Sequence, residues 1–324
     1  MMRNLTSLSP FPEINPFQLF WRIPMNAAKH ALIPLFWGGL LLLISGCAMQ
    51  VVDTPQSEYQ VFKGQKSTVI VDLVWDDVLR AFEELKVSDL HIVDIETYRK
   101  DNKQLFGAVW HRESPKTMFY RSSLGASGND WRTFESLWKS MKNDGMRLID
   151  IDIYQDAGQY YALSIWQEGR YEIAIRVNVK IGSEFDIVRD GMLKNGMVIA
   201  DFEPYDLGGS VFYVVVFRSG KGDDYFKSVG ERDFRSKFGD NRNGFELIDL
   251  EIYRENSSDK GATYAGAWKP GNVPQRLEIG VDWEQFLERC AAFEREGLYL
   301  NDLEIESRSS RPFSGVWSSQ NIGR

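Results

Sequence analysis

Residues 145–154 read Gly-Met-Arg-Leu-Ile-Asp-Ile-Asp-Ile-Tyr, and four related stretches recur along the chain at a spacing of about 50 residues. The other copies begin at Leu90, Gly196, Gly244 and Gly297 and read LHIVDIETY, GMVIADFEPY, GFELIDLEIY and GLYLNDLEIE. An aromatic residue closes each copy 15 to 19 residues after the shared aspartate, and these residues are Trp110, Trp166, Phe217, Trp268 and Trp317. Internal similarity at a fixed period is typical of repeat proteins, so the sequence predicts five copies of one structural unit.

Each copy follows a stretch with apolar residues at helical spacing, which starts at Trp75 in the first unit. The helix should stop at a residue in the left-handed conformation, which is a glycine in four copies and Asp89 in the first. Alternation of apolar and polar residues then predicts a strand with Ile149, Ile151 and Ile153 on one face. A hairpin to a second strand follows, and another extended stretch precedes each helix. The predicted unit is therefore strand, helix, strand, strand.

Such a unit is too small to bury enough apolar surface by itself, so neighbouring units must pack together. We expect an α+β fold in which the units form one curved, mainly antiparallel sheet, shaped as a half-barrel or ring, with the helices on its outer face. The sequence leaves open whether this sheet closes. The repeat domain should span 67–317, with units at 67–112, 117–168, 170–219, 224–270 and 275–317.

The segment 31–44 is almost wholly apolar, follows the basic residue Lys29 and leads into small residues. This order is typical of a secretory signal peptide, and the apolar run is shorter than the about 20 residues that span a bilayer. We therefore expect residues 1–46 to be a signal peptide, with translation starting at Met25, and residues 47–66 to be a tether. An ordinary secretory signal in which Cys47 stands by chance is the alternative.

The four residues Ile44-Ser45-Gly46-Cys47 resemble the lipobox of bacterial lipoproteins. The resemblance implies that Cys47 carries a diacylglyceryl group and an acyl chain such as palmitate. Two or more lipid chains hold a protein firmly on a membrane, whereas one chain binds only marginally. In the same family, a residue other than aspartate after the lipidated cysteine, here Ala48, implies delivery to the outer membrane, facing the periplasm.

The composition narrows the choice of partners and cofactors. Residues 1–46 hold three of the 38 basic and one of the 46 acidic residues, which leaves a net charge of about −10 after cleavage. Such a chain repels nucleic acid, so we expect no nucleic-acid partner. Only His91 and His111 remain after cleavage, without cysteine or histidine at ligand spacing, so no metal or other cofactor is expected. Cys290 occupies an apolar helix position and should be a buried, inert thiol.

The glycine, aspartate, tyrosine and tryptophan landmarks of the five copies resemble bacterial tandem repeat domain 1, the repeats in the N-terminal half of polyglycine hydrolases. The resemblance spans residues 67–317, although each motif is short. In those hydrolases the chemistry belongs to a separate serine β-lactamase-like domain, and this sequence has no counterpart of it. The resemblance therefore implies a repeat fold and no inherited enzymatic activity or catalytic residue.

The strand after each helix repeats an acid, acid, aromatic pattern, and stacked units would align these side chains. One interpretation is a concave face that binds a cationic peptide, a cation or a sugar. The other is that the shared aspartate bonds backbone N–H groups or an arginine at each unit junction, with the second acid solvated. The candidate residues are Asp94, Glu96, Tyr98, Asp150, Asp152, Tyr154, Asp201, Glu203, Tyr205, Asp249, Glu251, Tyr253, Asp302 and Glu304.

These patterns together favour a membrane-anchored, non-catalytic repeat lipoprotein that binds or organises a peptide, protein or glycan. A hydrolase of envelope polymers that uses paired carboxylates is the alternative, because two such groups suffice for glycoside hydrolysis. An accessory or inhibitor protein of a secreted hydrolase is a further alternative. A scaffold predicts similar surroundings for all five acidic patterns, whereas an enzyme predicts one cleft with one distinctive pair.

Overall fold

The computed structural model describes residues 59–112, 114–169, 173–222, 224–228, 230–241, 244–254 and 261–320. The expected signal peptide, Cys47 and the tether up to residue 58 lie outside the described residues. Among the residues that the structure describes, no helix is both long and apolar enough to cross a lipid bilayer.

The described chain repeats the order strand, helix, strand, strand five times. The first unit holds β2 (Ser67–Leu73), α1 (Trp75–Val87), β3 (Leu90–Lys100) and β4 (Lys103–Arg112), preceded by β1 (Gln60–Lys63). The second holds β5 (Thr117–Gly125), α2 (Arg132–Asn143), β6 (Met146–Asp156) and β7 (Gln159–Glu168). The third holds β8 (Ile173–Lys180), α3 (Ser183–Lys194), β9 (Met197–Leu207) and β10 (Ser210–Ser219). The fourth holds β11 (Asp224–Ser228), α4 (Glu231–Asn241), β12 (Phe245–Tyr253) and β13 (Thr263–Pro270), and the fifth β14 (Gln275–Val281), α5 (Trp283–Arg295), β15 (Tyr299–Ile305) and β16 (Phe313–Ser318).

The strands form five separate antiparallel sheets, one for each unit, in place of the single curved sheet expected. In each sheet the last strand of the unit lies in the middle and pairs with both other strands, as in the order β8-β10-β9. Strand pairing among the described residues therefore stays within each unit and does not continue into the sheet of the next unit. The first sheet gains a fourth strand because β1, which lies in the predicted tether, pairs with β2.

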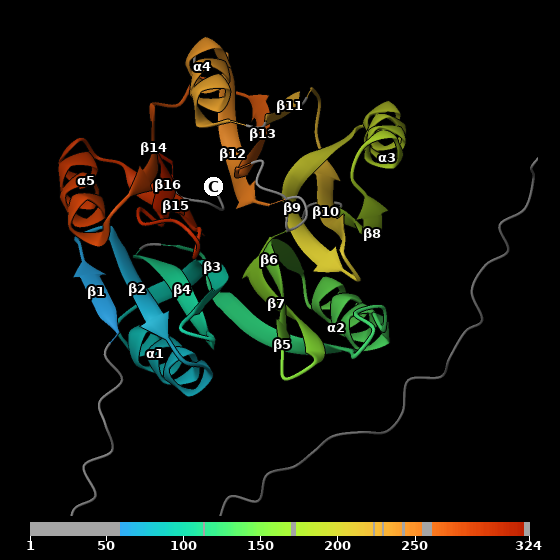
Figure 1. Cartoon of the computed structure of the whole chain (residues 1–324), viewed down its shortest axis with the longest axis horizontal. Helices are drawn as coiled ribbons and strands as arrows, with labels where there is room; N and C mark the ends of the chain where they lie inside the picture. Colours follow the sequence, from blue (N-terminus) through green and yellow to red (C-terminus); the bar gives the residue numbers. More distant parts are fainter. Residues whose placement is uncertain are drawn as a thin grey trace, which may run out of the picture. The chain divides into compact units, whose positions relative to one another are not determined.

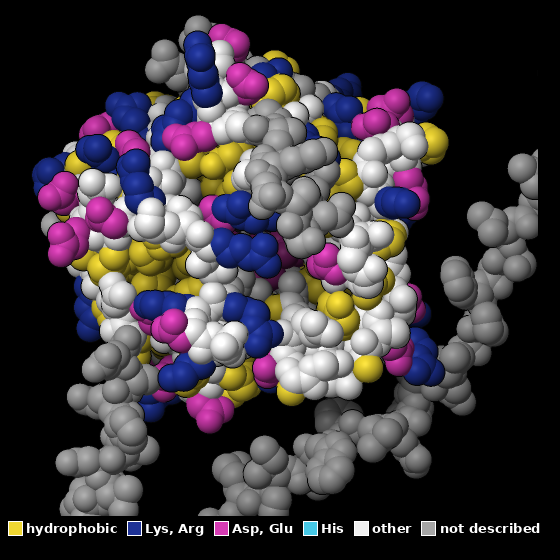
Figure 2. Space-filling model, in the orientation of Figure 1, with side chains coloured by type: hydrophobic (Ala, Val, Ile, Leu, Met, Phe, Trp, Pro, Cys, Tyr) yellow, Lys and Arg dark blue, Asp and Glu magenta, His cyan; other side chains and the backbone are white. Residues whose placement is uncertain are grey.

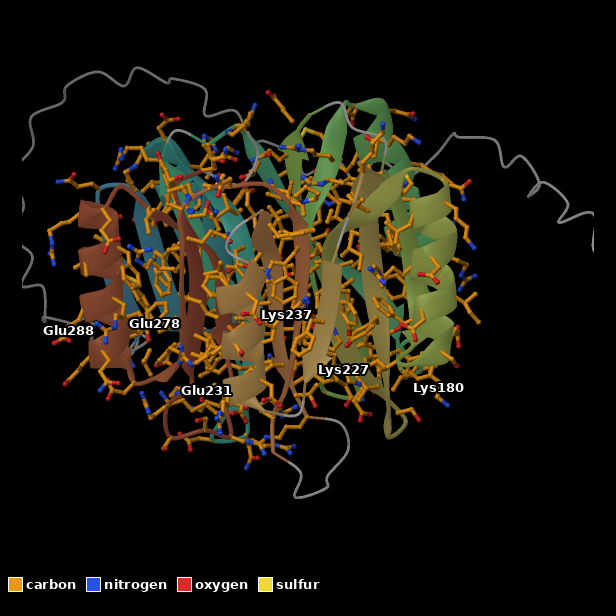
Figure 3. All side chains as sticks on the ribbon, turned by 90° about the horizontal axis from the view of Figure 1, so that it is seen from above. Lys180, Lys227, Glu231, Lys237, Glu278 and Glu288 are labelled. Atoms are coloured by element: carbon orange, nitrogen blue, oxygen red, sulfur yellow. The ribbon has the colours of Figure 1, made fainter. Side chains whose placement is uncertain are left out.

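The five sheets stand around a common centre, with the helices outside (Figure 1). The strands β3, β6, β9, β12 and β15 are innermost, and each contacts the innermost strand of the next unit. The contact of β15 with β3 brings the fifth unit against the first and closes the circle. Charged side chains such as those of Glu288 and Lys180 lie on the outer surface of the ring (Figure 3). This arrangement is the radial repetition of small sheets seen in propeller folds.

Apolar packing joins neighbouring units, as the sequence predicted. Each of the five buried clusters combines side chains of two adjacent units, and the five clusters together run around the whole ring. The closing aromatics stand in these clusters with at most 1% of their surface exposed. One example is the cluster in which Phe286 and Trp317 of the fifth unit pack with Val71 and Val109 of the first. A single unit would expose its own part of such a cluster to water.

The helix stops follow the sequence prediction, but the inner strands contain a feature that alternation does not reveal. Gly145 and Asp89 adopt φ angles of 73° and 58° directly before their strands. Each inner strand then has a β-bulge immediately before its shared aspartate. In the second unit this places Ile149 in the cluster shared with the first unit, whereas Ile151 and Ile153 pack toward the third. The predicted common face of these three isoleucines is therefore wrong.

Candidate functional site

The five shared aspartates each accept a hydrogen bond from the backbone N–H of the preceding unit's inner strand. The N–H groups belong to Leu303 for Asp94 (2.9 Å), Ile95 for Asp150 (3.2 Å), Ile151 for Asp201, Phe202 for Asp249 (2.8 Å) and Leu250 for Asp302 (2.7 Å). The bonds run in one direction around the ring and close on themselves, because Asp94 of the first unit bonds the fifth. This geometry confirms the prediction that the recurring aspartate serves the unit junctions.

The second acid of each pattern forms another layer, two residues further along the inner strand. Glu304 accepts the N–H of Ile252 at 2.9 Å, and Asp152 accepts hydrogen bonds from the backbone and hydroxyl of Thr97. We expected these acids to be solvated, and that expectation is wrong where the ring buries them. The exposed fractions of Asp152, Glu251 and Glu304 are only 4%, 8% and 4%.

The second layer is uneven at Glu251. Asp152 and Glu304 accept N–H groups two residues beyond those that the shared aspartates of their units accept, and for Glu251 the equivalent position holds Pro204. Proline has no backbone N–H, so this carboxyl lacks the donor that Ile252 supplies to Glu304. In another part of the layer, a hydrogen bond joins the carboxyl groups of Glu203 and Asp152.

Burial raises the pKa of all ten carboxyl groups, because the ring removes them from water. The pKa of Asp152 is raised to about 6 and that of Asp302 to about 7, and backbone N–H groups offset part of the effect. The pKa of Asp94 is raised well above its usual value, first by burial and then by repulsion from Asp150 and Asp302. The centre of the ring therefore retains protons near neutral pH.

The tyrosines of the pattern fill the junctions between units. Tyr98, Tyr154 and Tyr205 are 7%, 5% and 4% exposed. The hydroxyl of Tyr98 donates to Asp72 at 2.8 Å. The structure thus gathers the predicted candidate residues around one axis and buries most of them, whereas Glu96, Asp150, Glu203 and Tyr253 are half-buried. We call the end of the ring at which the inner strands begin its mouth.

A cavity of about 130 Å³ lies at that mouth and was not predicted. Its walls include the five shared aspartates, the five bulge residues and, further out, Arg147, Arg218 and Lys269. The bulge residues are Val93, Ile149, Ala200, Ile248 and Asn301. Arg218 and Lys269 directly follow the closing aromatics of their units. The varied residue at that position is the sequence signal that could have located the mouth.

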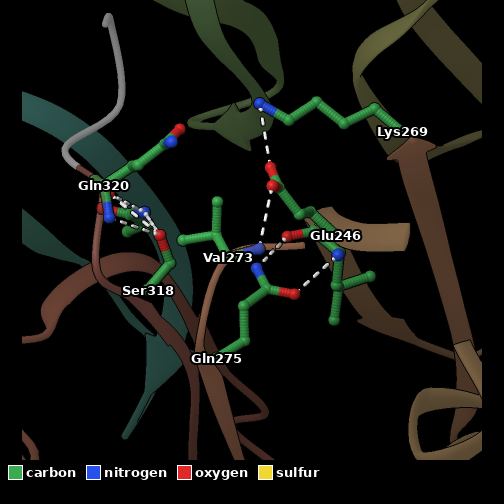
Figure 4. A network of polar contacts seen from close by, with 8 residues as sticks. Glu246, Lys269, Val273, Gln275, Ser318 and Gln320 are labelled. Carbon is green, nitrogen blue, oxygen red and sulfur yellow. Dashed lines mark hydrogen bonds and ion pairs between the residues drawn. The ribbon is translucent and has the colours of Figure 1, made fainter. Parts of the chain in front are cut away.

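Hydrogen bonds hold part of the rim in place. The carboxylate of Glu246 lies 3.2 Å from Lys269 Nζ and accepts the N–H of Val273 at 3.1 Å (Figure 4). Gln275 bonds both the N–H and the carbonyl of Leu247, at 2.8 and 2.7 Å. Figure 2 shows the opposite end of the ring, where the inner strands finish, and lysine and arginine side chains gather close to the centre of that face. At the rim of the cavity, the basic side chain of Lys269 lies beside the carboxylate of Glu246.

The histidines and the cysteine stand apart from this chemistry. His111 belongs to β4 and is fully buried, with Nε2 2.5 Å from the carbonyl oxygen of Leu300. Cys290 is 1% exposed, and burial raises the pKa of its thiol, which agrees with the inert role predicted. Within the described part of the chain, no cluster of histidine, cysteine, aspartate and glutamate side chains has the geometry to hold a metal ion.

Fold and site together define a ring of five repeats built on a buried core of carboxyl groups. The family model described as "Polyglycine hydrolase-like, structural repeat" matches this chain at residues 64–113 and 128–168, in the first two units. This similarity supports the predicted repeat domain. A comparison with curated proteins found no match.

Proposed function

We propose that the protein is a non-catalytic binding or scaffold module for a peptide, protein or glycan. The observation that carries this proposal is the equivalence of the five shared aspartates, each of which bonds the backbone of the neighbouring unit. A hydrolase with two carboxylates requires a distinct acid and a distinct base or nucleophile at an open site. Here the five shared aspartates make the same junction bond, which suits a rigid frame better than a catalytic pair.

The test uses the soluble part, Gln50–Arg324, and an envelope extract. A pull-down identifies the bound polymer or protein, and chromatography of that material after incubation shows whether it is cut. We expect binding without products. The five single Asp→Asn variants of the shared aspartates should retain binding equally, because an amide oxygen still accepts the backbone N–H. Release of products that only one of the five substitutions abolishes would overturn the proposal in favour of the hydrolase.

We further propose that lipid on Cys47 anchors the module to the cell envelope, at the outer membrane and facing the periplasm. The lipobox-like residues 44–47 and the short apolar run before them support this part. Labelled palmitate should enter the wild-type chain and not the Cys47→Ser variant, and the variant should leave the membrane fraction. Equal labelling of both chains would refute the anchor and leave the binding proposal untouched.

A second candidate is an accessory or inhibitor protein of a secreted hydrolase, which the match to a structural repeat of polyglycine hydrolase-like proteins favours. This candidate predicts that one hydrolase copurifies with the chain from membranes. It also predicts that excess soluble part changes the turnover of that hydrolase. A copurifying enzyme with unchanged turnover would speak against it.

A further inference from the structure

The first strand of the repeat unit faces the circumference of the ring, between two helices (Figure 1). In the first unit, β1 covers the outer edge of this strand by pairing antiparallel with β2, so that Val61 lies opposite Ile70 and Phe62 opposite Val69. The sheets of the other units end at β5, β8, β11 and β14, and no described strand pairs with their outer edges. An edge strand offers N–H and C=O groups to which another extended chain can bind.

The hairpin of β1 and β2 shows which backbone groups face an added strand. The N–H of Gly64 donates to the carbonyl oxygen of Ser67 at 2.9 Å, and hydrogen-bonded pairs recur at every second residue of an antiparallel ladder. Val69 therefore directs its N–H and C=O toward β1. It pairs on its other side with the residue directly before the closing aromatic, as do its counterparts Phe119, Ile175 and Leu277.

Arginine side chains cap this edge in the third and fifth units. Arg176 Nη1 donates to the carbonyl oxygen of Ile175 at 2.9 Å. In the fifth unit, Arg235 Nη2 of α4 donates to the carbonyl oxygen of Ile279 at 2.9 Å. Charged side chains on an edge strand protect it against pairing with another chain. The edges of β8 and β14 are therefore poor places for an added strand.

The edge of β5 carries no such cap among the described residues. The arginine of this strand, Arg121, stacks on Tyr161 instead, with its guanidinium carbon 3.7 Å from the ring centre. The N–H and C=O of Phe119 are therefore directed at an edge that neither a described strand nor an arginine covers.

The face of β5 toward α2 is more exposed than the same face of β2. Met118 is 37% exposed, and Tyr120, which packs beside Leu137 of α2, is half-buried. Their counterparts under β1, Thr68 and Ile70, are only 3% and 6% exposed. The apolar surface that β1 covers in the first unit is thus open in the second.

The same difference holds on the face of β5 toward α1. Leu79 lies between Trp75 and Phe82 on one face of that helix, and the rings of Trp75 and Phe82 have their centres 5.7 and 6.0 Å from that of Phe119. Leu79 is 44% exposed, whereas its counterpart Leu287 in α5, the helix against which β1 packs, is half-buried. Exposed apolar side chains therefore flank the edge of β5 on both sides.

We propose that the edge of β5 binds an extended peptide segment of a partner protein, which adds to the sheet as a further antiparallel strand. The occupied edge defines the chemistry of this segment, because β1 presents two adjacent apolar residues, Val61 and Phe62, between polar ones. The residue opposite Phe119 places a large apolar side chain beside Leu79, and the residue opposite Tyr120 turns one toward α2. This inference rests on the binding function proposed above and names the partner as a peptide.

Peptide binding to the full chain in detergent, measured by fluorescence anisotropy, tests strand addition. The probe has the sequence of residues 59–64, Tyr-Gln-Val-Phe-Lys-Gly, with a dye at its N-terminus. A methyl group on the phenylalanine nitrogen removes the N–H directed at β5 and should weaken binding at least about tenfold. A methyl group on the valine nitrogen, which faces away from β5, should leave binding nearly unchanged. Equal losses for both methylated peptides, or no binding of the unmethylated one, would overturn the proposal.

Variants locate the site on β5. Tyr120→Arg places on this strand the arginine that caps β8 at the same position, Arg176, so it should keep the fold and weaken the peptide at least about tenfold. Leu79→Ser should also weaken it. Ile187→Ser on α3, where the isoleucine is 72% exposed, is the matched control and should bind as wild type. Full binding by Tyr120→Arg would refute the site.

Two further measurements separate this proposal from its alternatives. In a pull-down from envelope extract, a partner that Tyr120→Arg retains as well as wild type would overturn the β5 site and leave the proposed binding function intact. Sedimentation of the wild-type chain without peptide should show a monomer. A dimer that Tyr120→Arg abolishes would assign the edge to a second copy of the chain and overturn the peptide partner.

Discussion

The junction between the first two units and the junction that closes the ring are held together by different sets of contacts. Between the first two units, the chain connection supplements the hydrogen bonds that Asp150 and Asp152 accept from the first unit and a shared apolar cluster. The closing junction has no such chain connection, and additional hydrogen bonds take its place. The carboxylate of Glu294 accepts the N–H groups of Gln65, Lys66 and Ser67 at 2.8, 2.9 and 2.8 Å. Closure of the ring thus depends on Gln65 and Lys66, which precede the first repeat, and on Ser67, its first residue.

A substitution in the apolar part of the closing junction should cause the largest loss of stability. Trp317→Ala removes a side chain that is 1% exposed and packs against Phe286 and Phe293. We expect the free energy of unfolding to fall by about 3–5 kcal/mol, the usual loss for a buried tryptophan. Urea unfolding followed by circular dichroism measures it. Trp166→Ala at an internal junction is the matched control, and a loss at position 317 below about 1 kcal/mol would show that the closing cluster contributes little.

The polar part of the closing junction should give the next effect. Glu294→Ala leaves three backbone N–H groups without their acceptor, which should lower the free energy of unfolding by about 2–4 kcal/mol. Glu288→Ala on the outer surface of the same helix should change it by less than about 0.5 kcal/mol. The same urea experiment compares the two. Equal stability of both variants would contradict the role given to Glu294.

The carboxyl centre predicts an unusual dependence on pH. A carboxyl group whose pKa is higher in the folded ring than in the unfolded chain binds more protons in the folded state. Its contribution to the free energy of unfolding is therefore full below the unfolded pKa and is lost as the pH rises through the folded pKa. Asp152 and Asp302 have pKa values of about 6 and about 7, so their contribution to the free energy of unfolding is lost between pH 4 and 7. Between pH 5 and 7 one such group accounts for about 2 kcal/mol.

Thermal unfolding at a series of pH values tests this dependence. The midpoint should be several degrees lower at pH 8 than at pH 5. Asp302→Asn, which cannot ionise but still accepts the N–H of Leu250, should flatten the curve. A midpoint that rises steadily from pH 5 to 8 in the wild-type chain would refute the protonated centre.

The uneven place in the second acidic layer should give the smallest effect. Pro204→Ile supplies the N–H that Glu251 lacks, and this hydrogen bond should stabilise the protein by about 1 kcal/mol. Loss of the proline also increases the conformational entropy of the unfolded chain, which offsets part of that gain. The measured change in midpoint should therefore be small and positive. Ile153→Val, a mild change in the same layer, provides the comparison. A clear decrease in the midpoint for Pro204→Ile would mean that the proline itself stabilises the inner strand.

The sequence predicted those features that repeat with a fixed local signal. The helix stops, including Asp89 with its φ of 58°, the buried closing aromatics and the junction bond of the shared aspartate all follow from residue type and spacing. The division into five sheets did not follow, because pairing within a unit and pairing between units use the same alternating pattern. The bulges were missed for a related reason, since one extra residue shifts the alternation without changing the composition.

The candidate site was predicted in part. Alternation placed Asp150 and Asp152 on one side of a strand but could not show that five strands would enclose them. Burial of the second acid depends on closure of the ring, which brings residues more than 200 positions apart together, as in the bond from Leu303 to Asp94. The cavity arises from the same closure.

The central claim is that no unit is complete without both neighbours, and removal of the fifth unit tests it most directly. A chain that ends at Gly271 lacks β14, α5, β15 and β16 and opens the ring between the fourth and first units. Urea unfolding of this chain, followed by tryptophan fluorescence beside the full chain, should show loss of the cooperative transition. A cooperative transition with its midpoint close to that of the full chain would contradict the claim.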